Sequence, residues 1–288
     1  RKSDRSVASC RHQCPGQQPY GHSGLCSEPV VASALALSKH LCRKAKNFIE
    51  RTGAKATPGS GDQTPVIELQ DVGYSYGGGD LLSGMTLSLL PGSFHFLTGP
   101  SGSGKTTFLK LCYGELKATS GRVSLMGQDA RSLDRDGIAA VRRRVGVVHQ
   151  DCQFLDHLDV ASNVTLPLAA AGREADAGEL SELLAWVGLS AQATAFPPSL
   201  SGGERQRAAL ARAVMMAPDM ILADEPTGNL DWDMSVRLLT LLVELNRMGK
   251  SILIATHDMN LIRAAKQQVS ARVLRIAGRK LTLAGADL

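Results

Sequence analysis

The sequence predicts an α/β fold with a mainly parallel core sheet, and three features of the chain carry that prediction. Short apolar runs typical of strands alternate with helical patterns from residue 66 onward. A glycine-rich loop, Gly99 to Thr106, follows the apolar run Phe94 to Leu97 and precedes a helical pattern. Two more apolar runs, Met220 to Ala223 and Ser251 to Ala255, are followed by acidic or histidine side chains. In open α/β sheets, ligands bind beyond such strand ends.

The N-terminal segment, residues 1–65, differs in composition from the rest of the 288-residue chain. It holds 10 Lys and Arg against 4 Asp and Glu, a net charge of +6, whereas the remainder holds 22 against 23, a net charge of −1. The basicity therefore belongs to this segment, and the core gives no argument for a nucleic-acid partner. No apolar run approaches the roughly 18 residues that a membrane-spanning helix needs.

We expect residues 1–65 to be a largely disordered, basic, cysteine-containing extension that ends in a linker, Thr57 to Gly61. Its Arg- and Ser-rich, acid-poor composition is typical of a transit peptide. Four of the six cysteines lie here, but their spacing does not form two clear ligand pairs, so a zinc site is the weaker interpretation. They are Cys10, Cys14, Cys26 and Cys42. Cys112 and Cys152 have apolar neighbours and are expected to be packed free thiols.

The run Gly99 to Thr106 has the phosphate-loop spacing G-x-x-x-x-G-K-T. Glycines let the backbone approach phosphates closely, and the N–H groups at the following helix N-terminus favour negative charge. Lys105 is expected to reach the β- and γ-phosphates, and the Thr106 hydroxyl to contact Mg²⁺. An ordinary glycine-rich turn is the alternative, and the partner residues described next argue against it.

Two aromatic or polar residues flank this loop in positions that suit a nucleotide. A strand that begins at Val66 leads to Tyr76, whose ring could stack on a base. An apolar run that begins at Val145 ends before Gln150, which suits a Mg²⁺ ligand or a residue that orients the attacking water. Each residue alone also fits an ordinary surface position.

Ser201-Gly202-Gly203-Glu204 forms a second expected anion site. Ser201 suits the N-cap of the helix that follows, and the glycines allow close approach to a phosphate. A plain capped helix is the alternative interpretation.

Three charged or polar side chains follow the two later buried strands. Asp224 suits Mg²⁺ coordination, and Glu225 suits the general base that polarises water for attack on the γ-phosphate. His257 is placed to contact the γ-phosphate and to hold Glu225 and the water in register.

The remaining patterns complete the expected architecture. The first strands, which include a short strand expected at Leu87 to Leu90, form an antiparallel β subdomain, and residues 151–200 form a helical subdomain. The best helix there carries Leu180, Leu183, Leu184 and Val187 at i, i+3, i+4 and i+7. Two strands joined at Ala277-Gly278 close the chain as a hairpin.

Together the motifs resemble the ATP-binding subunits of the ABC transporter family, whose domain has the phosphate-loop NTPase fold. The match covers residues 66–288, with each motif present once and in order. It implies an ATPase with ATP and Mg²⁺ at a shared site. The residues implied to contact nucleotide are Tyr76, Gly99, Pro100, Ser101, Gly102, Ser103, Gly104, Lys105, Thr106, Thr107, Ser201, Gly202, Gly203, Glu204 and Asp231. The implied metal ligands are Thr106, Gln150 and Asp224, and the implied catalytic residues are Glu225, His257 and Gln150.

Within the family, the runs 96–99, 223–231 and 255–262 resemble the FtsE-type cell-division subunits. That resemblance implies a peripheral protein on the cytoplasmic face of the bacterial inner membrane, with an FtsX-like integral membrane partner. ATP-driven dimer closure would then control cell-wall hydrolases during division. The run 223–231 is shared with lipoprotein-release and macrolide-export ATPases, so these remain the alternative.

The resemblance also implies a head-to-tail homodimer, because each chain carries one phosphate loop and one signature, Leu200 to Glu204. We expect Val160 to Leu168 to dock against the membrane partner. A DNA-repair ATPase would need a long coiled coil between Lys105 and Ser201, and that interval has no sustained heptads.

Overall fold

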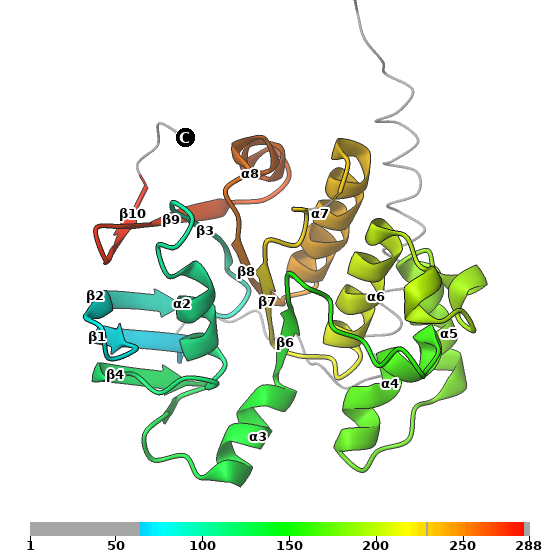
Figure 1. Cartoon of the computed structure of the whole chain (residues 1–288), viewed down its shortest axis with the longest axis horizontal. Helices are drawn as coiled ribbons and strands as arrows, with labels where there is room; N and C mark the ends of the chain where they lie inside the picture. The colour runs from blue at the N-terminus through cyan, green and yellow to red at the C-terminus, as the bar shows by residue number, and fades with distance from the viewer. Residues whose placement is uncertain (1–63, 229, 285–288) are drawn as a thin grey trace, which may run out of the picture. The chain divides into compact units, whose positions relative to one another are not determined.

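A six-stranded sheet carries the fold in the computed structural model, which describes residues 64–228 and 230–284 (Figure 1). All of these residues belong to one compact unit. Five strands are parallel, and only the edge strand β10 is antiparallel to its neighbour β9. The strand order is β10 (Lys280–Leu283), β9 (Ala271–Ala277), β3 (Phe94–Thr98), β8 (Ser251–Ala255), β7 (Met220–Asp224) and β6 (Val145–Val148).

A second sheet of four antiparallel strands stands beside the first, as the N-terminal patterns predicted. Its order is β2 (Asp80–Leu89), β1 (Ile67–Ser75), β4 (Ser120–Leu125) and β5 (Gln128–Asp129). The sequence pattern predicted a strand only at 87–90, but β2 is longer. It pairs with β1 along its whole length through register shifts that interrupt the alternation of apolar and polar residues.

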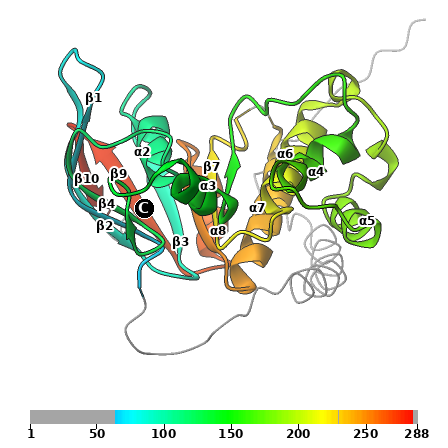
Figure 2. The ribbon, with the colours of Figure 1, turned by 90° about the horizontal axis from the view of Figure 1, so that it is seen from below.

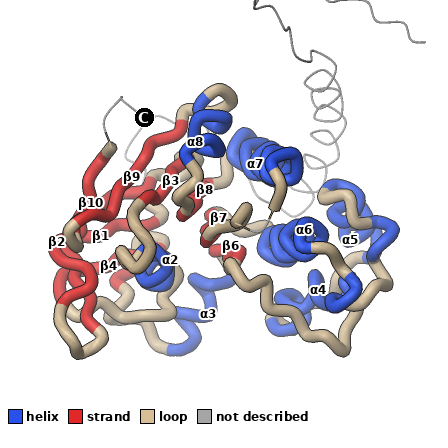
Figure 3. Tube along the Cα trace, turned by 45° about the horizontal axis from the view of Figure 1, so that its top comes forward, coloured by secondary structure: helices blue, strands red, loops and turns tan. Residues whose placement is uncertain are grey.

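The helices divide into two groups around the parallel sheet. Helix α2 lies between the two sheets, and α4 to α7 gather on the other side of the parallel sheet (Figures 1 and 2). Figure 3 shows the same separation of strand-rich and helix-rich halves. The helices are α2 (Lys105–Cys112), α3 (Arg135–Arg143), α4 (Val160–Ala170), α5 (Ala177–Trp186), α6 (Gly202–Val214), α7 (Trp232–Arg247) and α8 (Met259–Lys266), with 3₁₀ turns η1 (Ser190–Gln192) and η2 (Pro197–Ser199).

Alternating side chains of the parallel strands feed two cores. On β7, Ile221 and Ala223 join the core under the helices, whereas Met220 and Leu222 join the core around α2. Strand β8 alternates in the same way. This pattern follows from the two-residue period of a strand that is buried on both faces. The C-terminal ends of β3, β7 and β8 are therefore held between two packed layers.

Several expected elements are present. The helical stripe lies on α5, where Leu183 and Leu184 are buried. Strands β9 and β10 form the closing hairpin. Cys112 and Cys152 are buried free thiols. The N-terminal extension, with its four cysteines, lies outside the described residues, and no described helix is both long and apolar enough to cross a membrane.

Candidate active site

The phosphate loop joins the end of β3 to the start of α2, as predicted. Gly104 is the N-cap of α2 with a left-handed φ of 96°, and a Cβ there would come within 2.7 Å of Leu82 Cδ2. Only glycine fits that position without strain. Among the described residues no side chain caps α2, so the backbone N–H groups of its first turn have no side-chain acceptor there. The Ser103 hydroxyl is also buried, with no hydrogen-bond partner in the part of the chain that the structure describes. The loop thus offers several hydrogen-bond donors to one anion.

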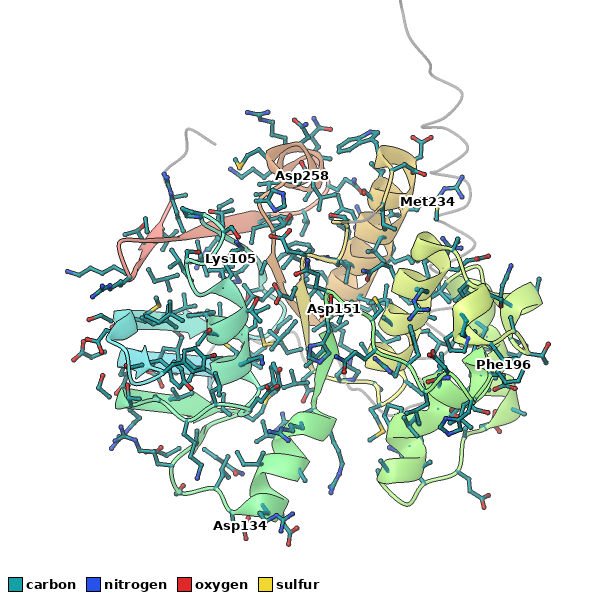
Figure 4. The ribbon with its side chains drawn as sticks, in the orientation of Figure 1. Lys105, Asp134, Asp151, Phe196, Met234 and Asp258 are labelled. Carbon is teal, nitrogen blue, oxygen red and sulfur yellow. The ribbon has the colours of Figure 1, made fainter. Side chains whose placement is uncertain are left out.

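Lys105 connects this loop to the acidic end of β7. Its ammonium group donates to the carbonyl oxygens of Gly99 at 3.0 Å and Pro100 at 3.3 Å. It also lies 3.8 Å from Glu225 Oε1. The side chains of Lys105 and Glu225 are both about nine-tenths buried, with exposed fractions of 10% and 12%. A positive charge therefore stands where the loop and the acidic strand end meet (Lys105 is labelled in Figure 4).

Glu225 lies between Lys105 and His257. Oε1 of Glu225 is 2.9 Å from Nδ1 of His257, whose side chain is 75% exposed. The Glu225 backbone N–H donates to Ala255 O at 2.8 Å, which ties this residue to β8. Glu225 also has a φ of 44°, a left-handed conformation that is rare for a residue with a side chain. Such strain persists where the surroundings fix it, and it is common at functional sites.

Thr106 and Asp224 form the second contact across the site. The Thr106 hydroxyl donates to Asp224 Oδ2 at 2.7 Å, which joins α2 to the end of β7. Burial raises the pKa of Asp224, and the negative charge of Glu225 raises it further, whereas the Thr106 hydrogen bond and the charge of Lys105 lower it. A hydroxyl and a carboxylate side by side are oxygen ligands of the kind that Mg²⁺ prefers.

Tyr76 lies at the edge of the same site. Its hydroxyl is 3.3 Å from the Thr107 hydroxyl, and its ring meets the Tyr74 ring edge-on at 4.8 Å between centroids. The Tyr76 side chain is nevertheless 65% exposed. The ring is thus held near the start of α2 while much of it stays open to solvent. This arrangement is compatible with the base stacking predicted for it.

The signature residues lie elsewhere in the chain. Ser201 caps α6 in a reciprocal capping box, in which its backbone N–H donates to Glu204 Oε2 at 2.8 Å. Helices α2 and α6 stand on opposite sides of β7 in Figures 1, 2 and 3. Among the described residues, no hydrogen bond or ion pair joins 201–204 to the loop 99–107. One chain therefore does not bring its two expected anion sites together.

Gln150 and Asp231 occupy intermediate positions. Gln150 follows β6 with an exposed side chain, and its carbonyl oxygen accepts a hydrogen bond from Gln206 of α6 at 3.4 Å. Asp231 is the N-cap of α7 and accepts from the Met234 N–H at 2.8 Å. The carboxylate of Asp231 thus satisfies its own helix. The roles of both residues toward a nucleotide remain predictions.

The model of the ABC transporter family matches residues 82–228, which contain the phosphate loop, the signature and the end of β7. The chain belongs to the ABC transporter family. Two curated relatives are cell-division ATP-binding proteins named FtsE. The Bacillus subtilis protein is 38% identical over 209 residues, covering 72% of this chain and 92% of the relative. The Haemophilus influenzae protein is 43% identical over 202 residues, covering 68% and 92%.

Solved ABC cassettes share the fold. A dimeric ATP-binding cassette in a post-hydrolysis state with ADP and Pi is 32% identical, with a TM-score of 0.67, and the match covers 75% of this chain and 96% of that one. The cbiO1 subunit of an ABC transporter complex from Clostridium perfringens is 26% identical, with a TM-score of 0.67. The predicted ABC-type α/β fold and the resemblance to FtsE-type ATPases are therefore confirmed.

The structure narrows one expectation about this ABC cassette. We expected the segment 160–168 to dock against a membrane partner, but Val160, Val164 and Leu168 are each at most 3% exposed and pack in the core under the helices. The other side of α4, where Ser162 is exposed and Pro167 is partly exposed, stays open to a partner. An apolar run in the sequence does not reveal which of its side chains a neighbouring element covers.

Sequence reasoning also missed contacts around the segment that follows β6. The Phe154 ring lies against Arg205 and Arg212 of α6. The two arginines are seven residues apart and so share one face of the helix. That spacing was visible in the sequence, but its aromatic partner lies some 50 residues upstream, and only the fold brings them together.

Proposed function

We propose that this chain binds and hydrolyses ATP as the nucleotide-binding subunit of an ABC-type membrane complex that acts in bacterial cell division. The observation that carries the catalytic part is the cluster of Lys105, Glu225 and His257 beside the pair Thr106 and Asp224. These side chains come from the ends of two strands, β7 and β8, and from the start of helix α2, and they meet where α/β sheets bind ligands. The FtsE names of the relatives support the cell-division part and do not favour lipoprotein release or macrolide export.

Each side chain has a distinct task in this proposal. Lys105 and the donors of the phosphate loop hold the phosphates and offset their negative charge. Glu225 accepts the proton of the attacking water, and His257, 2.9 Å from Glu225, fixes the orientation of that carboxylate. Tyr76 stacks on the base, and Gln150 orients the water. Residues 201–204, with the neighbouring Asp231, serve the nucleotide held by a second copy.

Mg²⁺ fits the oxygen ligands at Thr106 and Asp224. The described residues contain no group of three or more His, Cys, Asp or Glu side chains that could hold a metal alone. Mg²⁺ typically binds one or two carboxylates together with water and substrate phosphates, so such a cage is not required. Thr106, Asp224 and Gln150 would hold the ion, which when bound neutralises charge on the phosphates.

Replacing Glu225 by Gln tests the proposed catalytic role. The amide cannot accept the proton, so we expect turnover to fall by at least about 100-fold. ATP binding should persist, and ATP-bound dimers should accumulate because hydrolysis no longer separates them. Steady-state ATPase assays, equilibrium binding of ATP·Mg²⁺ and light scattering would measure the three quantities.

Glu174→Gln is the matched control, since it makes the same change at an exposed position between α4 and α5. It should leave all three quantities at the parent values. Turnover of Glu225→Gln at the parent rate would disprove the assignment of the base. Failure of the parent chain to bind ATP would disprove the proposed function itself.

The proposed assembly is a homodimer bound to an FtsX-like integral membrane partner on the cytoplasmic face of the inner membrane. Residues 66–288 form the ATPase domain in this proposal, with the helical subdomain near 151–200, and residues 1–65 form an extension. Affinity purification of Glu225→Gln with ATP·Mg²⁺ from native membranes would identify the partner. Recovery of a permease of another class would assign the subunit to transport or lipoprotein release.

A groove between α3 and α4 is the proposed contact for that partner. It has a volume of about 830 Å³ and is lined by cations together with apolar side chains such as Ile138, Pro167 and Met216. Its cations are Lys117, Arg135, Arg142 and Arg143, and its one acid, Asp134, caps α3. This charge pattern favours a cytoplasmic segment of the partner that carries acidic and apolar side chains.

A further inference from the structure

The ring of Phe154 contacts two arginines of helix α6, the helix that begins within the signature. The guanidinium carbon of Arg212 lies 4.7 Å from the centroid of the Phe154 ring, and that of Arg205 lies 5.7 Å away. Cations at these distances from a ring are attracted by its electron-rich face. Phe154 is also partly buried against the core under the helices. The ring therefore fastens the segment after β6 to one face of α6.

Two hydrogen bonds fasten the same segment to the same helix. Arg212 Nη1 donates to Gln153 O at 2.5 Å, and Gln206 Nε2 donates to Gln150 O at 3.4 Å. Burial lowers the pKa of Arg212, because removing its charge from water costs free energy. The contacts of the guanidinium with the Phe154 ring and the Gln153 carbonyl oxygen offset that cost. Residues 150–154, which include Asp151 (labelled in Figure 4), are thus attached to α6 at both ends.

The segment between these attachments is conformationally constrained. Cys152 has a φ of 36°, a left-handed conformation that costs energy for a residue with a side chain. Gln206 is 3% exposed, and its Oε1 has no partner among the described residues. A strained residue and an unsatisfied buried amide persist only where the surroundings hold them in place.

We propose that Phe154 is a positioning residue for Gln150. Because the Phe154 ring contacts Arg205 and Arg212, it ties segment 150–154 to helix α6, and the two move together. The inference rests on the proposed function, in which Gln150 serves the chain's own nucleotide and the Ser201 end of α6 serves the nucleotide of a second copy. Closure of the dimer against α6 would then place Gln150 in the chain's own site.

Replacing Phe154 by Leu tests this role, with Phe154→Tyr as the conservative variant. Leucine keeps an apolar side chain but loses the ring, so Gln150 is held less firmly. We expect kcat to fall about five- to tenfold while the KM for ATP changes less than about twofold. Tyrosine keeps the ring face and should restore most of the rate. Equal losses in both variants would overturn the proposal.

A double-mutant cycle separates positioning from a general loss of packing. If Phe154 acts through Gln150, Phe154→Leu should not slow a Gln150→Ala enzyme further. If it slows that enzyme by the same factor as the parent, Phe154 acts by another route and the proposal is wrong.

Amide hydrogen exchange tests the attachment without any need for ATP hydrolysis. Phe154→Leu should speed exchange in 150–154 and leave α7 unchanged. Unchanged exchange in 150–154 would overturn the proposal even if the parent is an active ATPase. The opposite result is also distinguishable. If Phe154→Leu speeds exchange in 150–154 but the parent chain does not hydrolyse ATP, only the proposed function is contradicted.

Discussion

At the scale of single residues, the site is built from short contacts between side chains that are far apart in the sequence. Thr106 and Asp224 are 118 residues apart, and His257 and Glu225 are 32 apart. Each pair forms because parallel strands end at one edge of the sheet. The sequence assigned these residues to one site, because Asp224, Glu225 and His257 follow apolar runs and Thr106 ends the glycine-rich loop. It did not predict that Lys105 lies 3.8 Å from Glu225, because that contact depends on the path of the loop.

His95 on β3 supplies a prediction about pH and stability. It is 3% exposed, and its Nδ1 has no hydrogen-bond partner within residues 64–228 and 230–284. Burial and the charge of nearby Arg272 lower its pKa to about 4. Below about pH 6.5 the unfolded chain takes up a proton at this histidine that the folded chain does not, so stability falls as pH falls toward 4. The loss due to this group should be about 2 kcal/mol at pH 5 relative to pH 8.

The variant His95→Leu should lack that loss. Denaturant unfolding of the parent and the variant at pH 8 and pH 5 would measure the difference in the free energy of unfolding. His157→Ala, at an exposed position, is the control and should follow the parent. An equal drop in stability for His95→Leu and the parent would show that His95 does not carry this pH dependence.

At the scale of elements, a strand or helix was predictable where the spacing of its apolar residues and the residue types at its ends indicated the same element. Strand β7 was predicted to within one residue, because four apolar residues are followed directly by the two carboxylates of Asp224 and Glu225. Strand β2 was predicted too short, because register shifts against β1 break its alternation. The whole segment 160–168 was expected to dock against a partner, whereas Val160, Val164 and Leu168 within it are buried. The spacing of apolar residues along a helix identifies its apolar face, but only the fold determines which element packs against that face.

The groove between α3 and α4 supplies the prediction at this scale. Arg142 donates to Gly114 O at 3.0 Å, and no ion pair is found for Arg135 or Arg143 among the described residues. Replacing both Arg135 and Arg143 by Glu should repel an acidic segment and reduce recovery of the membrane partner at least about tenfold. Co-purification from membranes would measure this, and raised salt should weaken the parent complex as well.

The control for this charge reversal is Lys280→Glu, an exposed change on β10 outside the groove. It should leave partner recovery at the parent level. ATP binding by the isolated chain should stay unchanged in both proteins, since the groove does not contact the phosphate loop. Full partner recovery with the Arg135 and Arg143 changes would place the contact on another surface.

At the scale of the whole molecule, the separation of the signature from the phosphate loop determines how the chain can work. The loop's donors can serve one anion, but helix α6, which Ser201 caps, lies beyond β6 and β7 (Figure 1). The proposed function therefore requires a second copy, placed head to tail, to complete each site. The solved relative in a post-hydrolysis state is itself dimeric, which supports this arrangement.

Mixing two inactive variants tests the head-to-tail dimer. Lys105→Ala removes the phosphate-binding ammonium, and Ser201→Arg places a bulky side chain at the N-terminus of α6. Each variant alone should lack turnover, because both sites of its homodimer carry the defect. In the mixed dimer, the loop of the Ser201→Arg chain faces the intact signature of the Lys105→Ala chain, so one site is whole.

The mixture should regain activity from that one intact site. At equal concentrations and random pairing about half of the dimers are mixed, which sets an upper limit near one quarter of the parent rate if the two sites act independently. ATPase assays of each variant and of the mixture would measure this, with a mixture of Lys105→Ala and Glu225→Gln as the control. In that control both chains carry a defective loop-side site, so no dimer contains an intact site and turnover should stay absent. Mixed dimers must first be shown to form. If the ATPase activity of the first mixture then does not exceed the sum of the activities of the two variants alone, a site shared between two chains is excluded.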